Sequence, residues 1–215
     1  MKKLLFLTPF LMLIMGCSSL SGSSANDEII IKSGNLNALE QLHKRAISQN
    51  SNYKSTDINK ISLALSMAYL KSGDFDNASF ILESISQPSL EKDVLLSKVY
   101  LAKSDNANLN AFLSNLECHE FNDNCSELYR IKMLAAVKNK ELKRAFSYSE
   151  KQRLYGGLTT VSRNDLAALH MLSGHYDRAK NILLSILQQD PDNLTAKENM
   201  KVVEGMTNDK SKNKL

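Results

Sequence analysis

Three cysteines, Cys17, Cys118 and Cys125, carry the most reactive side chains of this 215-residue chain. On one continuous helix the Cα atoms of Cys118 and Cys125 would lie about 10 Å apart, which is too far for a disulfide. The Asn-Asp-Asn run at 122–124 indicates a turn between them, and a turn can bring the two thiols together. Outside the cytoplasm such a pair is expected to be oxidised, so we predict a disulfide between Cys118 and Cys125.

A metal site is the alternative use of the same segment, because His119 directly follows Cys118. Structural zinc sites have four ligands and commonly place two of them as Cys-x-x-Cys. This segment offers no convincing fourth ligand and has a different cysteine spacing. We therefore favour the disulfide and predict neither a metal site nor a cofactor.

Catalytic patterns are not found elsewhere in the chain. The sequence contains no Gly-x-Ser-x-Gly, His-Glu-x-x-His, P-loop or dinucleotide-binding pattern. Its carboxylates are scattered, and the Gly156-Gly157 pair is typical of a helix end and not of a phosphate-binding loop. We predict no catalytic residues and a protein that is not an enzyme.

Cys17 closes a segment with the layout of a signal peptide. A basic start (2–3) precedes an apolar run (4–15), and Gly16 stands before the cysteine. The run is shorter than the roughly 20 residues that a membrane-spanning helix needs. A small residue directly before cysteine closely resembles the lipobox of bacterial lipoproteins. This resemblance implies that residues 1–16 are removed and that Cys17 receives a diacylglycerol and an amide-linked acyl chain.

The residues after Cys17 bear on location. Ser18 stands where aspartate would indicate inner-membrane retention, so the resemblance implies a protein anchored in the outer membrane and facing the periplasm. An ordinary signal peptide, with Cys17 incidental, is the alternative. Residues 17–26 are rich in Ser and Gly and are predicted to form a lipidated flexible tether. The polar, lysine-rich residues 207–215 are predicted to form a disordered tail.

The charge balance argues against nucleic acid as a partner. Twenty-seven Lys and Arg residues against 23 Asp and Glu give a net charge of +4, and loss of Lys2 and Lys3 with the leader leaves +2. The two signs are mixed along the chain, whereas nucleic-acid-binding domains concentrate basic residues in patches.

Two segments of the chain share one pattern without gaps. In 65–78 and 166–179, leucine with small neighbours precedes a glycine, an aromatic residue follows two positions later, and an alanine five positions after the glycine. Pro191 closes the second segment. The pattern resembles the tetratricopeptide repeat, which implies two antiparallel helices joined at Gly73 and again at Gly174. Glycine suits such a turn because it adopts the left-handed conformation that ends many helices.

Weaker turn signals extend the pattern over the rest of the chain. The predicted turns are separated by 39, 31, 36 and 34 residues and lie near residues 34, 73, 104, 140 and 174. We therefore predict an all-α, tetratricopeptide-like solenoid of about five helix pairs plus a closing helix, spanning residues 27–206. Within it, His170 is expected to be a packed ring and His175 a solvated turn residue.

Repeats of this family use the first helix of each pair to line a concave, ligand-binding face. Carrying the family's contact positions onto this chain gives cationic residues with aliphatic neighbours such as Leu63 and Met67, which would suit an extended segment bearing a carboxylate. The candidate groove residues are Lys60, Lys71, Lys98, Arg130, Lys138 and Asn164.

A lipid-anchored array of such repeats resembles, through residues 162–179 and 196–200, the Tad/Flp pilus assembly lipoprotein family (TadD). The pilotin family of type IV pili (PilF/PilW) is a second resemblance. Both imply an adaptor that assists assembly of a pilus or related secretion system, with a secretin or other envelope proteins as partners. A non-catalytic accessory role in outer-membrane protein insertion or peptidoglycan metabolism is the alternative.

Overall fold

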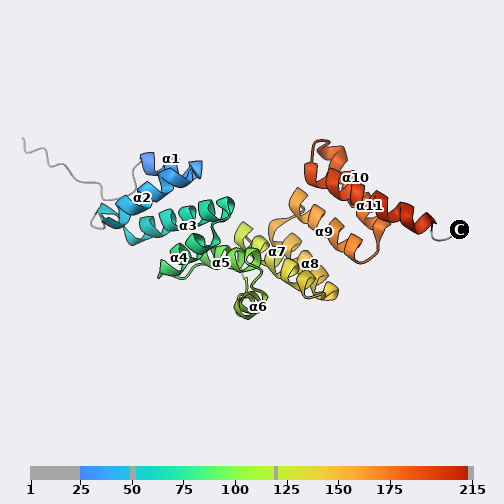
Figure 1. Cartoon of the computed structure of the whole chain (residues 1–215), viewed down its shortest axis with the longest axis horizontal. Helices are drawn as coiled ribbons and strands as arrows, with labels where there is room; N and C mark the ends of the chain where they lie inside the picture. Colours follow the sequence, from blue (N-terminus) through green and yellow to red (C-terminus); the bar gives the residue numbers. More distant parts are fainter. Residues whose placement is uncertain (1–24, 49–51, 119–120, 213–215) are drawn as a thin grey trace, which may run out of the picture.

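The computed structural model describes residues 25–48, 52–118 and 121–212, with side chains described as far as Thr207. These residues form an array of helices that follow one another in an open arch (Figure 1). The helices are α1 (Ala25–Ser33), α2 (Leu36–Ser48), α3 (Ser55–Ser72), α4 (Phe75–Ser84), α5 (Leu90–Ala102), α6 (Asn106–Ser114), α7 (Asp123–Lys138), α8 (Leu142–Gly156), α9 (Thr160–Leu172), α10 (Tyr176–Gln189) and α11 (Leu194–Lys212).

Consecutive helices pair as hairpins, from α1 with α2 to α9 with α10, and α11 packs on the last pair. Each helix contacts helices that are near it in the sequence, which is the arrangement of a solenoid. The prediction of an all-α solenoid with about five helix pairs and a closing helix is confirmed.

All five predicted turns place one residue in the left-handed region of the backbone. Glycine adopts this region without the steric cost that a Cβ atom brings, but two of the five residues are not glycine. The five residues and their φ values are Gly34 (63°), Gly73 (83°), Ser104 (57°), Lys140 (61°) and Gly174 (74°). The left-handed turn is therefore kept at Ser104 and Lys140, where the glycine of the repeat pattern is replaced.

Short polar side chains set where many of the helices begin. In each case a side-chain oxygen accepts a hydrogen bond from the backbone N–H three residues later, which satisfies a donor that the first helical turn leaves free. The capping residues are Asp74, Ser89, Asp105, Asn122 and Thr159.

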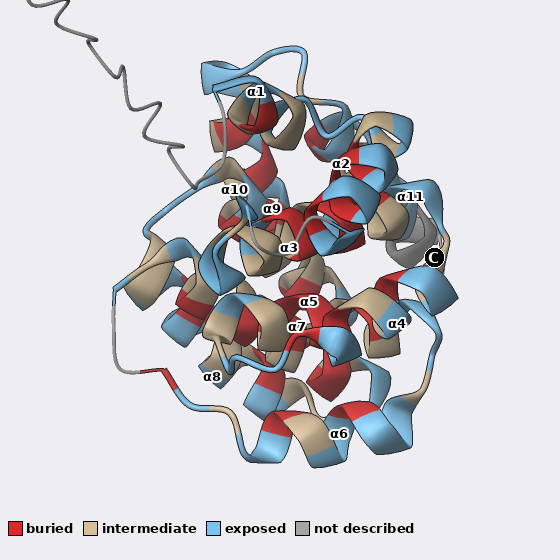
Figure 2. Ribbon diagram, turned by 90° about the vertical axis from the view of Figure 1, so that its left-hand side faces the viewer, coloured by how far each residue is buried: buried red, intermediate tan, exposed pale blue. Residues whose placement is uncertain are grey.

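Buried side chains lie between neighbouring helices along the whole array, and exposed residues cover its outside (Figure 2). Alanine occupies the tightest positions: Ala78, Ala145, Ala167 and Ala179 are fully buried. A larger side chain there would force the helices apart. The core is therefore a series of small clusters, one at each interface.

The interface before α9 differs from the others. α9 meets the preceding pair mainly through α8, and the cluster that joins them consists of Met133, Ala136, Ala145 and Leu169. Gly157, with φ 75°, separates the two helices. The apolar contact between the last three helices and the others is thus small.

The ends of the array differ from the expected boundaries. α1 begins at Ala25, so the end of the tether expected over 17–26 is helical, and α11 continues to Lys212 into the tail expected over 207–215. The expected signal peptide and Cys17 lie outside the described residues. None of the described helices is both long enough and apolar enough to cross a membrane.

Candidate functional site

A groove of about 590 Å³ runs along α3, between the end of α1 and the segment that leads into α5. We call it the α3 groove. The residues that α3 contributes recur every three or four positions and so lie on one face of the helix. These residues are Thr56, Asn59, Lys60, Leu63, Ala64, Met67, Ala68 and Lys71.

The middle of the α3 groove is apolar. Leu63 and Met67 line it beside Ala64 and Ala68, and Met67 leaves 39% of its surface exposed. The groove therefore offers aliphatic surface that a partner's side chain can cover.

Neighbouring elements supply the walls of the α3 groove. Ile31 and Lys32 come from the end of α1, and Ile85 and Gln87 from the loop between α4 and α5. The Nδ2 atom of Asn59 donates a hydrogen bond to Oε1 of Gln87 at 3.0 Å, which ties this loop to α3. The groove thus depends on three successive repeats.

The rim of the α3 groove carries three lysines, Lys32, Lys60 and Lys71, and one acid, Glu91. Lys60 pairs with Glu28 of α1 at 2.5 Å. Lys32 and Lys71 each stand two residues before a left-handed turn glycine. The groove therefore combines an apolar middle with surplus positive charge at its edge.

Three of the other candidate residues connect neighbouring helices. Lys98 of α5 pairs with Glu127 of α7 at 3.0 Å, and Arg130 of α7 pairs with Asp165 of α9 at 2.8 Å. The ammonium of Lys138 donates to the carbonyl of Leu101 at 3.2 Å. These cations hold adjacent repeats together, and they lie outside the α3 groove.

The electrostatics of Arg130 fit this connecting role. Burial alone would lower its pKa, but hydrogen bonding and attraction to Asp165, with a further contribution from Glu127, raise the pKa above its ordinary value. Gln152 also donates to Asp165, at 3.2 Å. The charged form of Arg130 is therefore held by its partners on α7 and α9.

Asn164 differs from the expectation of a groove residue. Its side chain is buried and donates to the carbonyl of Thr160 at 3.1 Å and to Oδ1 of Asn193 at 3.5 Å. The side chain thus links α9 to the start of α11. The tetratricopeptide pattern predicted that this residue lines the binding groove, but the side chain is covered where the closing helix α11 packs on α9.

Sequence reasoning missed Lys32 and the loop residues of the groove. Lys32 has the same position before its turn as Lys71 and Lys138, so applying the spacing to the first turn would have found it. Ile85 and Gln87 had no such signal, because they reach the groove only through the packing of α5 beside α3.

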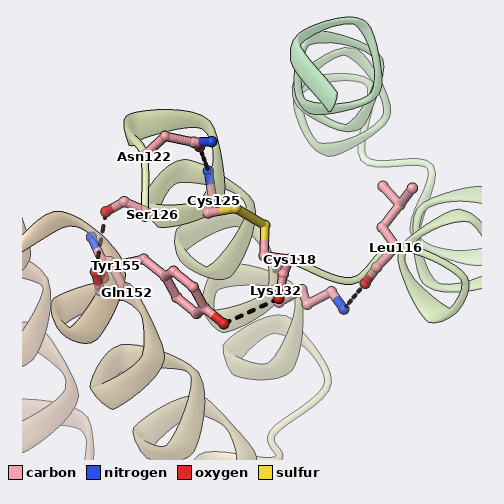
Figure 3. The surroundings of a disulfide bond; sticks show 8 residues. All are labelled: Leu116, Cys118, Asn122, Cys125, Ser126, Lys132, Gln152 and Tyr155. Atoms are coloured by element: carbon pink, nitrogen blue, oxygen red, sulfur yellow. Dashed lines mark hydrogen bonds between the residues drawn. A yellow bond between two sulfur atoms is a disulfide. The ribbon is translucent and has the colours of Figure 1, made fainter. Parts of the chain in front are cut away.

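The two cysteines of the predicted disulfide lie together at the start of α7, whose first turn contains Cys125 (Figure 3). Their Cα atoms are 5.6 Å apart, and a disulfide joins the sulfur atoms. Hydrogen bonds brace the segment before α7: the hydroxyl of Tyr155 donates to the carbonyl of Cys118 at 3.1 Å, and Lys132 donates to that of Leu116 at 2.5 Å. His119 lies outside the described residues, and within those residues no three metal-binding side chains converge.

The described histidines take packing and capping positions. His43 is buried, with Nε2 3.0 Å from the hydroxyl of Ser62. Ser62 is itself buried in the helix core, where a substrate cannot reach it, so this pair is a structural contact and not the exposed nucleophile and base of a catalytic site. His170 packs against Phe146 with 5.2 Å between ring centres, and His175 is exposed at the start of α10.

No protein-family model and no curated protein sequence matches this chain. A solved structure with a similar fold is that of TTC0263, a thermophilic TPR protein from Thermus thermophilus. The similarity has a TM-score of 0.63 and 17% sequence identity, and it covers 82% of this chain and 97% of that chain. An identity this low shows the fold alone.

The fold and the groove define the class of the protein: it is an all-α solenoid of the tetratricopeptide type. Such arrays expose extended surfaces that bind other proteins. They are typically scaffolds and not catalysts.

Proposed function

We propose that the protein is a lipid-anchored adaptor that binds a segment of a protein partner in the α3 groove. The observation that supports this most directly is the groove itself, in which Leu63 and Met67 follow Lys60 and precede Lys71 on one face of α3, and Lys32 lines the same groove from α1. A segment that places an apolar side chain in the middle and a carboxylate at the edge complements this surface.

The anchor is the second part of the proposal. The lipobox resemblance at Cys17 supports acylation and a location at the periplasmic face of the outer membrane. Several acyl chains hold a protein at a membrane far more firmly than one, since each buried methylene contributes roughly 0.8 kcal/mol. Confinement to the membrane surface raises the effective concentration of the groove near membrane-embedded partners.

The machine that we propose is a Tad/Flp-type pilus or a related secretion system. The resemblance of residues 162–179 and 196–200 to TadD supports this assignment, together with the combination of lipobox and repeats. The partner would then be a secretin or another envelope component of that system.

The groove is tested by reversing its chemistry. Met67→Glu places a charge in the apolar middle and Lys71→Glu reverses the rim, so both changes should abolish co-purification of the partner from membranes. Leu184→Glu on α10 is the matched control, because Leu184 is 42% exposed and lies outside the groove. Unchanged co-purification in the Met67→Glu variant would contradict a role for the groove.

The anchor is tested by Cys17→Ser. We expect this variant to move from the membrane fraction to the soluble fraction and to bind the partner in solution as before. Loss of surface pili in a deletion strain, restored by the original gene and not by Cys17→Ser, is the expected physiological result. Altered cell-wall fragments or porin levels with normal pili would instead support the accessory role in the envelope.

A further inference from the structure

A second cavity, of about 560 Å³, lies between α6, α7 and α8. We call it the lateral pocket. α6 is seen nearly end-on in Figure 1, whereas α8 lies across the view, so the two helices are not stacked side by side. The short α6 therefore leaves part of α7 and α8 uncovered, and this surface forms the pocket.

Positive charge gathers on aromatic rings inside the lateral pocket. The ammonium of Lys132 lies 5.7 Å from the ring centre of Tyr129, and that of Lys151 lies 5.1 Å from the same ring. The guanidinium of Arg144 lies 6.0 Å from the ring centre of Tyr148. All five residues line the pocket, and the rings hold the cations in place through cation–π attraction.

The residues that line the lateral pocket carry one more positive charge than negative charge. The three cations are Lys132, Arg144 and Lys151, and the two acids are Glu117 and Glu141. Glu141 forms an ion pair with Arg144 at 2.6 Å. One of the three N–H donors of Lys132 already donates a hydrogen bond to the carbonyl of Leu116. Burial lowers the pKa of Lys132 and the like charges of Lys151 and Arg144 lower it further, whereas Glu117 raises it. A bound anion would add to the effect of Glu117 and stabilise the charged ammonium.

We propose that the lateral pocket binds a single carboxylate of an acidic segment in a protein partner. Lys132 and Lys151 would hold the carboxylate, and the ring of Tyr148 would lie beside the chain that carries it. A single surplus charge matches a monovalent carboxylate better than a phosphate, which carries nearly two charges at neutral pH. This inference is independent of the α3 groove and assigns a second binding site to the chain.

The disulfide segment forms one wall of the lateral pocket. Glu117 precedes Cys118 directly, and the Cys118–Cys125 bond with the hydrogen bond from Lys132 to Leu116 fixes this wall against α7 (Figure 3). A wall held in place lowers the entropy lost when a ligand is bound. Reduction of the disulfide is therefore expected to weaken binding in the lateral pocket.

The test uses the purified full-length protein carrying Met67→Glu and Lys71→Glu, so that the α3 groove is blocked. Blocked hexaglutamate is titrated by calorimetry at low salt, with hexaglutamine as the neutral control. We expect binding of hexaglutamate alone, weakened about tenfold by Lys132→Gln and again by Lys151→Gln, since each removes a charge-assisted hydrogen bond. Lys143→Gln, on the exposed side of α8, should leave the dissociation constant unchanged, and circular dichroism checks that each variant is folded.

Three results would overturn the proposal. The first is the absence of hexaglutamate binding when the α3 groove is blocked, and the second is unchanged binding after both lysines are replaced. The third is equal or tighter binding of inorganic phosphate with the same dependence on Lys132 and Lys151, which would assign the pocket to a different anion. None of these results bears on the groove, whose own test uses the unblocked protein.

Discussion

Lys140 shows how a single residue can keep a turn that its side chain disfavours. It ends the α7 side of a hairpin with φ 61°, a conformation that costs a residue with a Cβ atom roughly 1–2 kcal/mol. Three of the five equivalent turns use glycine. The surrounding hairpin therefore imposes this conformation on Lys140.

Lys140→Gly is expected to raise the free energy of unfolding by about 1 kcal/mol, because glycine adopts the left-handed conformation freely. Urea unfolding followed by circular dichroism measures the change. Lys143→Gly is the matched control, since the same substitution inside α8 should lower stability by about 0.5–1 kcal/mol. A loss of stability in both variants would show that the turn conformation carries no strain.

His43 gives the protein a pH dependence of known sign. Burial lowers the pKa of this histidine below its ordinary value of 6.5, so the unfolded chain binds a proton more readily than the folded one. Its contribution to stability is complete above pH 6.5 and is lost as the pH falls towards the lowered value. We expect His43→Gln to flatten the decline of unfolding free energy between neutral and mildly acidic pH.

His170 is compared in the same way, because burial lowers its pKa and the neighbouring Arg178 and His175 lower it further. His170→Gln should also flatten the decline, and the variant with both histidines replaced should flatten it most. If neither variant flattened the decline, groups other than these two histidines would govern the dependence.

At the scale of helices, the α7–α8 hairpin depends on a close backbone approach. A Cβ atom added to Gly156 would lie 2.6 Å from the Cβ of Ser126 and would also overlap its hydroxyl oxygen. Ser126 already donates to the carbonyl of Gln152 at 3.2 Å. The two helices therefore meet at a point where only glycine fits.

Gly156→Ala is expected to lower the free energy of unfolding by about 1–3 kcal/mol, the usual cost of overpacking. Thermal unfolding by calorimetry measures it. Gly205→Ala in α11 is the control, because nothing lies within 4 Å of a Cβ atom added there. This substitution should raise the free energy of unfolding by up to about 1 kcal/mol. Equal effects at the two positions would contradict the close approach.

The helices and turns were predictable because their signals are local. A turn glycine, a capping Asp or Ser, and an apolar residue every three or four positions act within a few residues of themselves, so Gly73 and Asp74 could be read directly from the sequence. The left-handed Ser104 and Lys140 could not, since nothing in either side chain favours that conformation. Their geometry follows from the hairpin as a whole.

The candidate site was predictable only along α3. Lys60, Leu63, Met67 and Lys71 share one face because of helical spacing, whereas the walls of the groove depend on how neighbouring repeats pack. The ion-pair partners of the cations could not be predicted either, because they are far away in the sequence. Glu28 is 32 residues from Lys60, and Asp165 is 35 residues from Arg130. These separations are close to one repeat, so acids one repeat away are where such partners should be sought.

At the scale of the whole molecule, stability is distributed over successive interfaces, and the apolar cluster at the interface before α9 draws only Leu169 from that helix. The Arg130–Asp165 pair adds a charged contact there, with Asp165 largely buried. Removing one member of such a pair leaves the other poorly solvated. The last three helices should therefore respond together to a change at this contact.

Arg130→Gln is expected to lower stability by about 1–3 kcal/mol and to speed amide hydrogen exchange throughout α9, α10 and α11, with little change in α1 to α4. Mass-spectrometric hydrogen exchange measures the pattern. Arg153→Gln is the control, because its pair with Glu150 is exposed and contributes little. Uniform exchange changes over the whole chain would show a single cooperative unit instead.

The sparse contact before α9 also determines how the molecule bears tension. A solenoid pulled at its two ends carries the load through its interfaces in series, and the weakest of them extends first. Gly157 stands at that interface with a conformation that glycine leaves easily. We therefore expect the interface before α9 to open first under load, so a partner that pulled on the far end of the array would move the last three helices before disturbing the groove.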